Sequence, residues 1–289
     1  MSGFVERHWA SSDGLRLYAR DYWPAAGEAR LPVVCLHGFT RNSADFEELA
    51  PRIAETGRRV IAPDVRGRGR SEWDPNPAHY QPKIYARDLL RLMDRLGISS
   101  AVFVGTSMGG LITMAIAAIR SRAIAAAILN DVGPEIGKQG IGRILSYAGK
   151  PVAIRSWDDA AEYVRRNNGV AFPGFSDADW QKFARRTFRD EGGIPVLDYD
   201  AAIAVPTSKG PPKTRSLLAT LLFRRLARKR PTLLIRGEHS DLTTAEIAER
   251  MKGSAPTMKV CTVPGVGHAP MLTEPEAASA IDEFLKSVP

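Results

Sequence analysis

Residues 101–119, AVFVGTSMGGLITMAIAAI, contain the pattern that decides the fold. The first four residues are apolar, as expected of a buried parallel strand. A glycine-x-serine-x-glycine turn follows at 105–109, and the remaining residues favour an apolar helix. A glycine turn between a strand and a helix lifts the Ser107 hydroxyl above the edge of a sheet, at a helix N-terminus that favours negative charge.

The same stretch is uncharged from Gly97 to Ile119, which is long enough to span a bilayer. Its glycine-rich centre suits a sharp turn better than a spanning helix. We therefore expect no membrane span here.

Strand and helix patterns alternate outward from this turn. Residues 4–22 predict two strands around a turn. Short apolar runs predict buried strands at 33–36, 60–62, 101–104, 124–129, 233–235 and 258–263, with helices between them at 46–55, 84–96, 108–119 and 243–251 and after them at 275–288. This alternation predicts a mostly parallel sheet with helices on both faces.

The alternation stops from about Val132 to Arg230. Between Pro134 and Arg230 the chain has 18 basic and 10 acidic side chains, which account for the whole formal charge of +8. We therefore predict a core formed by residues 1–131 and 231–289, interrupted by a helical insertion at 132–230.

Composition places the chain among ordinary globular proteins, because 44% of its 289 residues are hydrophobic and 25% are charged. Two cysteines, Cys35 and Cys261, are too few for a disulfide scaffold. The first residues contain Glu6 and Arg7 and no apolar signal segment, so we expect a cytoplasmic protein.

A serine becomes a nucleophile when a base takes its proton. Of five histidines, His268 is the best base, because it follows the last predicted strand, where open α/β sheets place their sites. The carboxylate that orients it is predicted to be Asp241, after strand 232–236, with Asp131, after strand 124–129, as the alternative. The N–H groups of Phe39 and Met108 are the predicted oxyanion donors.

These motifs resemble the α/β-hydrolase superfamily: residues 37–39 (HGF), the glycine turn at 64–71 (DVRGRGRS), G-x-S-x-G at 105–109, then Asp241 and His268. The resemblance covers nearly the whole chain outside the insertion. It implies an eight-stranded, mostly parallel sheet, with a helical lid inserted after the sixth strand at 132–230. It also implies the triad Ser107, Asp241 and His268, working without cofactor or metal.

The favoured function is a serine hydrolase of small carboxylic esters or lactones that forms an acyl-enzyme. One alternative is a carbon–carbon bond hydrolase of ring-cleavage products, although relatives of that kind usually have tryptophan after the histidine and this chain has Ala269. Another is a ligand receptor that retains the triad and turns over slowly.

Two basic segments raise the question of partners. Residues 66–70 (RGRGR) resemble an RNA-binding segment, and residues 224–230 resemble a basic tract. One short copy is weak evidence for RNA binding. The tract lies beside leucines at helical spacing, so we expect it to form a solvated helix face. We expect a small-molecule substrate, no nucleic acid and no membrane partner; a homo-oligomer is compatible with the sequence.

Overall fold

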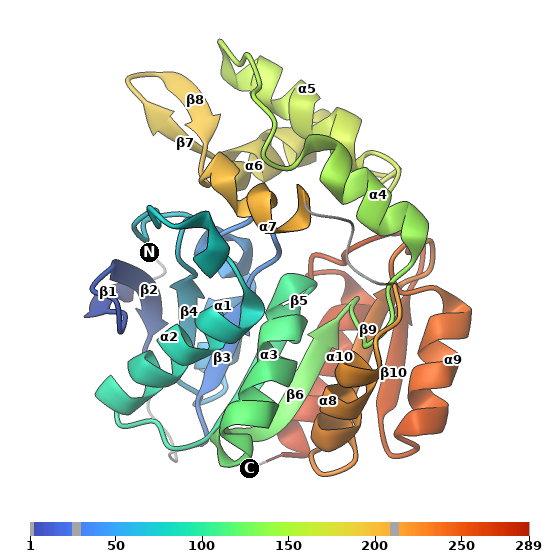
Figure 1. Cartoon of the computed structure of the whole chain (residues 1–289). Coiled ribbons are helices and arrows are strands. Elements are labelled where there is room, and N and C mark those ends of the chain that lie inside the picture. The colour runs from blue at the N-terminus through green and yellow to red at the C-terminus, as the bar shows by residue number, and fades with distance from the viewer. Residues whose placement is uncertain (1–2, 25–29, 209–213, 289) are drawn as a thin grey trace.

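A computed structural model describes residues 3–24, 30–208 and 214–288. An eight-stranded sheet forms its centre (Figure 1). In spatial order the strands are β1 (Phe4–Ala10), β2 (Arg16–Tyr22), β4 (Val60–Asp64), β3 (Val33–Leu36), β5 (Ala101–Thr106), β6 (Ile124–Asn130), β9 (Thr232–Gly237) and β10 (Lys259–Val263). The pairs β1–β2 and β2–β4 are antiparallel and the others are parallel, so the predicted sheet is confirmed.

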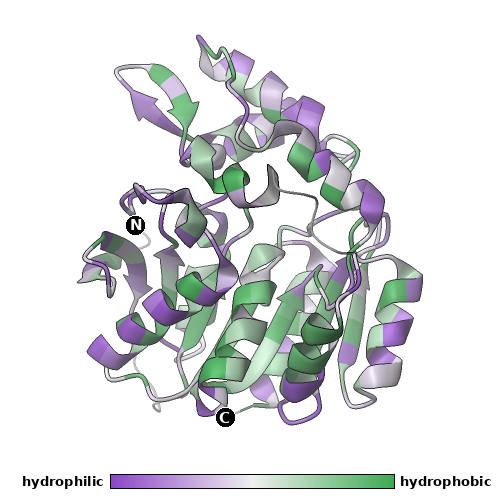
Figure 2. Ribbon diagram, in the orientation of Figure 1, coloured by the Kyte–Doolittle hydropathy of each residue, from purple (hydrophilic) through white to green (hydrophobic). Residues whose placement is uncertain are grey.

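Side chains of the central strands alternate between two apolar layers, as the period of two in a strand requires. Leu36, Phe103 and Leu129 face a layer formed by α2 (Pro82–Arg95), α3 (Met108–Ile119), α8 (Leu217–Ala227) and α9 (Ala245–Ser254). Val104 and Ile128 face the other layer, with α1 (Leu49–Glu55) and α10 (Pro275–Lys286). In Figure 2 the central strands are coloured hydrophobic, while polar residues mark the outer helices.

Residues 97–119 form a strand, a turn and a helix of 12 residues. Within the described ranges, no helix has both the length and the hydropathy needed to cross a membrane. Both cysteines are free thiols; Cys35 is buried and Cys261 half-buried.

Residues between β6 and β9, apart from α8, lie at the end of the sheet where the parallel strands finish (Figure 1). The whole segment forms α4 (Lys138–Tyr147), α5 (Trp157–Asn168), α6 (Asp177–Thr187), the hairpin β7 (Phe188–Glu191)–β8 (Ile194–Leu197), α7 (Val205–Ser208) and α8. Capping boxes at Ser156 and Ser176 begin α5 and α6. These two helices share a small core of their own around Val164, Trp180 and Phe183.

The structure differs from the sequence expectation in two parts of this segment. The hairpin β7–β8 is a separate two-stranded sheet, whereas only helices were predicted there. Helix α8 packs beside α3 and buries Phe223 and Leu226 in the main core. The part of the insertion that stands over the sheet therefore ends before α8.

Arginines of the two basic segments make internal contacts. Arg66 and Arg68 are buried. In the second segment Arg225 and Arg230 donate to the backbone carbonyls of Ala117 and Ile124, at 3.1 and 2.6 Å. The second segment was expected to form a solvated helix face, but these two guanidinium groups instead satisfy carbonyls at the ends of core elements.

Candidate active site

Ser107 occupies the turn between β5 and α3 in a strained conformation, with φ 50° and ψ −113°. The glycines on either side allow this turn because the chain comes very close to itself. A Cβ at Gly105 would lie 2.6 Å from the backbone of Gly109, and one at Gly109 would lie 2.1 Å from the carbonyl oxygen of Leu36. Only glycine fits these positions, so the serine is held at the end of the sheet.

His268 contacts Ser107 through one ring nitrogen and Asp131 through the other. Its Nε2 lies 3.1 Å from the Ser107 Oγ, and its Nδ1 lies 2.9 Å from Asp131 Oδ2. Asp131 is fully buried, and His268 is 9% exposed. The structure thus brings together the predicted serine and histidine, and aligns a buried carboxylate behind them.

Asp241 is not that carboxylate, which corrects the sequence prediction. Its two oxygens accept from Nε and Nη2 of Arg143, both at 2.8 Å. Burial alone would raise the pKa of Asp241, but the hydrogen bonds and charge of Arg143 outweigh burial and place it below the ordinary range. Arg143 lies in α4, so the insertion supplies the partner that engages Asp241.

Strand order explains why Asp131 holds this place. Asp131 directly follows β6, which is paired with β5, the strand that leads into Ser107. Asp241 follows β9, one strand farther away. Chain order could not separate the two, since both aspartates lie between the serine and the histidine.

The residues that carry the predicted oxyanion donors, Phe39 and Met108, line a cavity together with Ser107. Phe39 follows β3, and Met108 is the first residue of α3. His37 holds the loop after β3: its Nδ1–H donates to the Gly38 carbonyl at 2.8 Å, and its Nε2 accepts from the Val65 N–H at 3.2 Å. Burial lowers the pKa of His37, so the ring stays neutral and keeps both bonds.

Two cavities meet at Ser107. The first has a volume of about 100 Å³, and polar side chains enter it from both the core and the insertion. These include Thr40, Arg41, Ser107, Arg143, Tyr147, Tyr163, Asn167, Asn168, Tyr199 and His268. The second has a volume of about 340 Å³ and a mainly apolar wall that includes Met108, Leu111, Val132, Ile141 and Leu145. Phe39, Ser107 and Ile144 line both.

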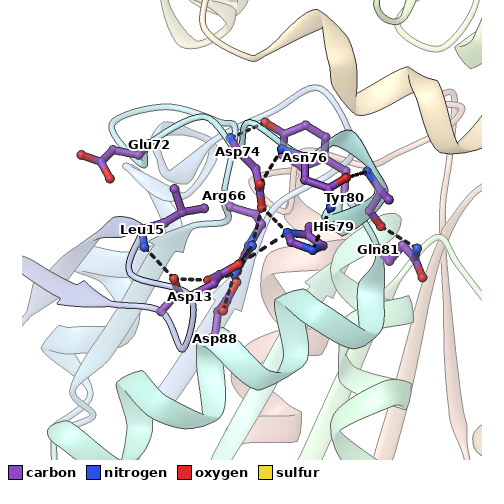
Figure 3. A network of polar contacts seen from close by, with 12 residues as sticks. Asp13, Leu15, Arg66, Glu72, Asp74, Asn76, His79, Tyr80, Gln81 and Asp88 are labelled. Atoms are coloured by element: carbon purple, nitrogen blue, oxygen red, sulfur yellow. Dashed lines mark hydrogen bonds and ion pairs between the residues drawn. The ribbon is translucent and has the colours of Figure 1, made fainter.

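A separate cluster of Asp13, Asp74 and His79 has ligand atoms within 4.8 Å of one another, as a metal site would need. Figure 3 shows the Arg66 guanidinium lying among these groups. Arg66 donates to Asp13 at 2.7 Å, to Asp74 at 2.5 Å and to Asp88 at 2.8 Å. The guanidinium therefore supplies the positive charge that these carboxylates require.

Comparison with known proteins gives similar sequences and structures over nearly the full chain. The model of the alpha/beta hydrolase family matches residues 33–281. The 3-hydroxybutyrate-oligomer hydrolase of Cupriavidus necator is 32% identical, covering 98% of this chain and 96% of that protein. A crystal structure of an alpha/beta hydrolase from Novosphingobium aromaticivorans is 41% identical with a TM-score of 0.91, covering 99% of both chains. The structure of E-2-(acetamidomethylene)succinate hydrolase is 25% identical with a TM-score of 0.77, covering 99% of this chain and 97% of the other.

Proposed function

Because the chain belongs to the alpha/beta hydrolase family and is a hydrolase of that type, we propose that it cleaves carboxylic esters through an acyl-enzyme on Ser107. The observation that carries the proposal is the hydrogen-bonded row Asp131–His268–Ser107 at the meeting point of two cavities. A serine, a base and a group that orients the base are the parts that acyl transfer needs.

In the first half of the reaction, the Ser107 Oγ attacks the ester carbonyl while its proton moves to Nε2 of His268. Asp131 accepts a hydrogen bond from the Nδ1–H of His268, which keeps Nε2 free to accept and stabilises the imidazolium that forms. The N–H groups of Phe39 and Met108 donate to the carbonyl oxygen as it gains negative charge. The imidazolium then protonates the leaving alcohol, and the acyl group remains on Ser107.

In the second half, a water molecule attacks the acyl-enzyme carbonyl. His268 takes one proton from this water and returns it to the Ser107 oxygen as the carbon–oxygen bond breaks. The carboxylic acid leaves, and the starting state is restored. The overall reaction consumes one water and yields one acid and one alcohol.

The choice of esters rests on the site and on the relatives together. An ester or lactone presents an acyl part and an alcohol part on opposite sides of the scissile bond, and Ser107 lies between a cavity lined by both polar and apolar side chains and a second, mainly apolar cavity. The Cupriavidus necator relative, which aligns over 98% of this chain, is a 3-hydroxybutyrate-oligomer hydrolase. We assign this chain the same broad class, hydrolysis of small hydroxy-acid and related esters.

We also propose that the insertion works as a lid. Helices α4 and α5 contribute Arg143, Tyr147, Tyr163 and Asn167 to the wall of the Ser107 cavity. Helices α5 and α6 share a small core, and Arg186 of α6 pairs with Glu47 and Glu48 just before α1, so an opening movement of these helices would break those ion pairs. Such a lid excludes water during acylation and admits it afterwards.

The test is turnover of an ester panel by the wild type and by Ser107→Ala. The panel holds p-nitrophenyl esters of graded acyl length, a lactone and the 3-hydroxybutyrate dimer, with products identified by mass spectrometry. We expect Ser107→Ala to lower kcat by about 10⁴-fold or more, because the residues of such a site act as a unit. The matched control is Ser121→Ala, at the opposite end of the sheet, which keeps wild-type rates. Equal rates for wild type and Ser107→Ala would contradict the proposal.

A further inference from the structure

Three buried polar atoms in the wall of the Ser107 cavity have no well-formed hydrogen bond, although Tyr163 interacts with Tyr199 and Asn167, and Tyr199 with the Gly149 backbone. The three atoms are the Tyr163 and Tyr199 hydroxyls and the Asn167 side-chain nitrogen. Leaving such a group unpaired is costly, and native proteins rarely do so without a functional reason. Burial raises the pKa of both tyrosines, so their hydroxyls keep the proton that they donate.

Backbone and ring contacts hold Tyr163, Asn167 and Tyr199 in fixed positions. We call these three residues the donor wall. Tyr163 and Asn167 are four residues apart in α5 and so share one face of the helix. The Tyr163 ring packs edge-on against Phe188, with ring centroids 5.7 Å apart. The Tyr199 segment is tied to the glycine turn by two backbone bonds, Gly69 N–H to Asp198 O at 2.9 Å and Asp200 N–H to Gly67 O at 2.8 Å.

The charges nearby are already balanced. Arg143 pairs with Asp241 through two bonds of 2.8 Å, and Arg41 pairs with Asp45 while its guanidinium lies over the Phe183 ring. The donor wall therefore offers N–H and O–H groups without an unmatched positive charge. Such a surface complements a neutral oxygen acceptor better than a carboxylate.

The second cavity has fewer polar side chains in its wall than the first. Its wall is mainly aliphatic, and the two tyrosine hydroxyls on it already have partners: Tyr80 with Asp200 at 2.5 Å, and Tyr85 with Arg68 at 2.8 Å. An apolar branch fits this side of Ser107, and an oxygen-bearing branch fits the other. In the proposed reaction Phe39 and Met108 hold the scissile carbonyl, so the donor wall is left for another oxygen of the substrate.

Building on the proposed function, we propose that Tyr163, Asn167 and Tyr199 form a specificity subsite for an uncharged second carbonyl oxygen. The preferred substrates are then neutral diesters and oligoesters with one apolar branch, rather than simple monoesters or free half-acids. The three side chains do not take part in bond breaking. They position the substrate through an oxygen away from the scissile bond.

Three esters of similar length separate these possibilities. Ethyl pentanoate lacks a second oxygen function, diethyl succinate carries a neutral second carbonyl, and monoethyl succinate carries a carboxylate. We expect kcat/KM for diethyl succinate to exceed that of ethyl pentanoate by about tenfold or more, because an analogue that lacks the acceptor leaves buried donors unpaired. Monoethyl succinate is expected to fall below diethyl succinate.

The variants Tyr163→Phe, Tyr199→Phe and Asn167→Leu remove the donors and keep the side-chain volume. Each should lower kcat/KM for diethyl succinate and bring the diethyl succinate to ethyl pentanoate ratio closer to one. Tyr18→Phe, in β2, is the matched control and should leave the ratio unchanged. If the two hydroxyls have no structural role, Tyr163→Phe and Tyr199→Phe should have melting temperatures at or above that of the wild type. A structural role would lower the melting temperature of these variants.

Binding to Ser107→Ala tests the subsite without turnover. Diethyl succinate should raise the melting temperature of Ser107→Ala more than ethyl pentanoate does, and Tyr163→Phe should remove the difference. If kcat/KM is similar for diethyl succinate and ethyl pentanoate while turnover still depends on Ser107, the subsite is refuted and the proposed function is retained. Absence of turnover, with the binding difference intact, would overturn the proposed function alone. Equal melting shifts for the two esters would show that the donor wall binds only water, and would overturn the subsite.

Discussion

Replacing Asp131 with asparagine tests which carboxylate orients the catalytic histidine. The wild-type carboxylate is fully buried and accepts the His268 Nδ1 proton at 2.9 Å. Asparagine keeps the shape, but removes the negative charge and presents an amide that can donate to Nδ1. A ring that accepts at Nδ1 carries its proton on Nε2, and Nε2 can then no longer take the proton of Ser107.

Two contributions set the size of the effect. A carboxylate and an imidazolium with charge centres about 4 Å apart attract by about 4 kcal/mol at an effective dielectric of about 20. The wrong ring tautomer adds to this loss. Together they predict a fall in kcat of about 10⁴-fold, or about 5 kcal/mol in the barrier.

Asp241→Asn is the matched control, because it removes a carboxylate from the next strand end. It breaks the pair with Arg143, in which the two side chains are 18% and 20% exposed, and should cost about 1 kcal/mol of unfolding free energy. Since the Asp241 carboxylate bonds to Arg143 while His268 Nδ1 bonds to Asp131, kcat should stay within about tenfold of wild type.

The assay is steady-state hydrolysis of a p-nitrophenyl ester at a pH where the wild type is fully active, with thermal melts to show that both variants fold. The reasoning is refuted if Asp241→Asn loses about 10⁴-fold while Asp131→Asn stays nearly normal. Similar losses in both variants would show that the two carboxylates act together, which also contradicts the assignment.

Three further outcomes concern stability. Gly109→Ala should prevent folding or strongly lower the melting temperature, because the new Cβ would lie 2.1 Å from Leu36 O. Gly142→Ala is the control: it has open space around it, so its melting temperature should equal or slightly exceed that of the wild type. Arg66→Met should cost about 3–5 kcal/mol in urea unfolding, because it leaves the carboxylates of Figure 3 without their cation. Burial, and then a neighbouring carboxylate, raises the pKa of Asp198 to about 6, so the folded state retains a proton that the unfolded chain loses near pH 4. Unfolding free energy should therefore fall as pH rises from about 4 to 6, and Asp198→Asn should flatten that slope; an unchanged slope would contradict the shift.

Local sequence patterns were sufficient to predict the sheet and two of the residues at the site. Ser107 is identified by the glycines that its turn requires, and His268 by its place after the last strand. Both signals are local, because backbone sterics and strand ends act within a few residues. The family model and the similar structures confirm the fold that these patterns predict.

The choice of carboxylate depended on contacts between distant segments. Asp131 and Asp241 both follow buried strands and both precede His268, so their order along the chain is uninformative. What separates them is the lateral order of β5, β6 and β9, together with Arg143 arriving from the insertion to pair with Asp241. The strongest signal for Asp131 in the sequence was its position immediately after a buried apolar run. The structure adds that this run, β6, pairs with β5, the strand that leads into Ser107.

The insertion was the least predictable part for the same reason. The sequence alone does not distinguish an aromatic side chain that packs in a core from one that lines a cavity. The fold shows that Trp180 packs in the small core, while Tyr163 and the polar Asn167 line the cavity at Ser107. Helix α8 was assigned to the insertion because its sequence contains several arginines. In the structure its apolar side chains pack beside α3 in the main core.

The most direct test of the central claim is a pre-steady-state burst with a p-nitrophenyl ester, combined with intact-mass analysis of the quenched protein. We expect one nitrophenolate released per enzyme, one acyl group added to the chain on Ser107, and loss of both signals in Ser107→Ala. Rapid turnover with neither burst nor adduct at any ester concentration, or an adduct on another residue, would contradict the acyl-enzyme mechanism.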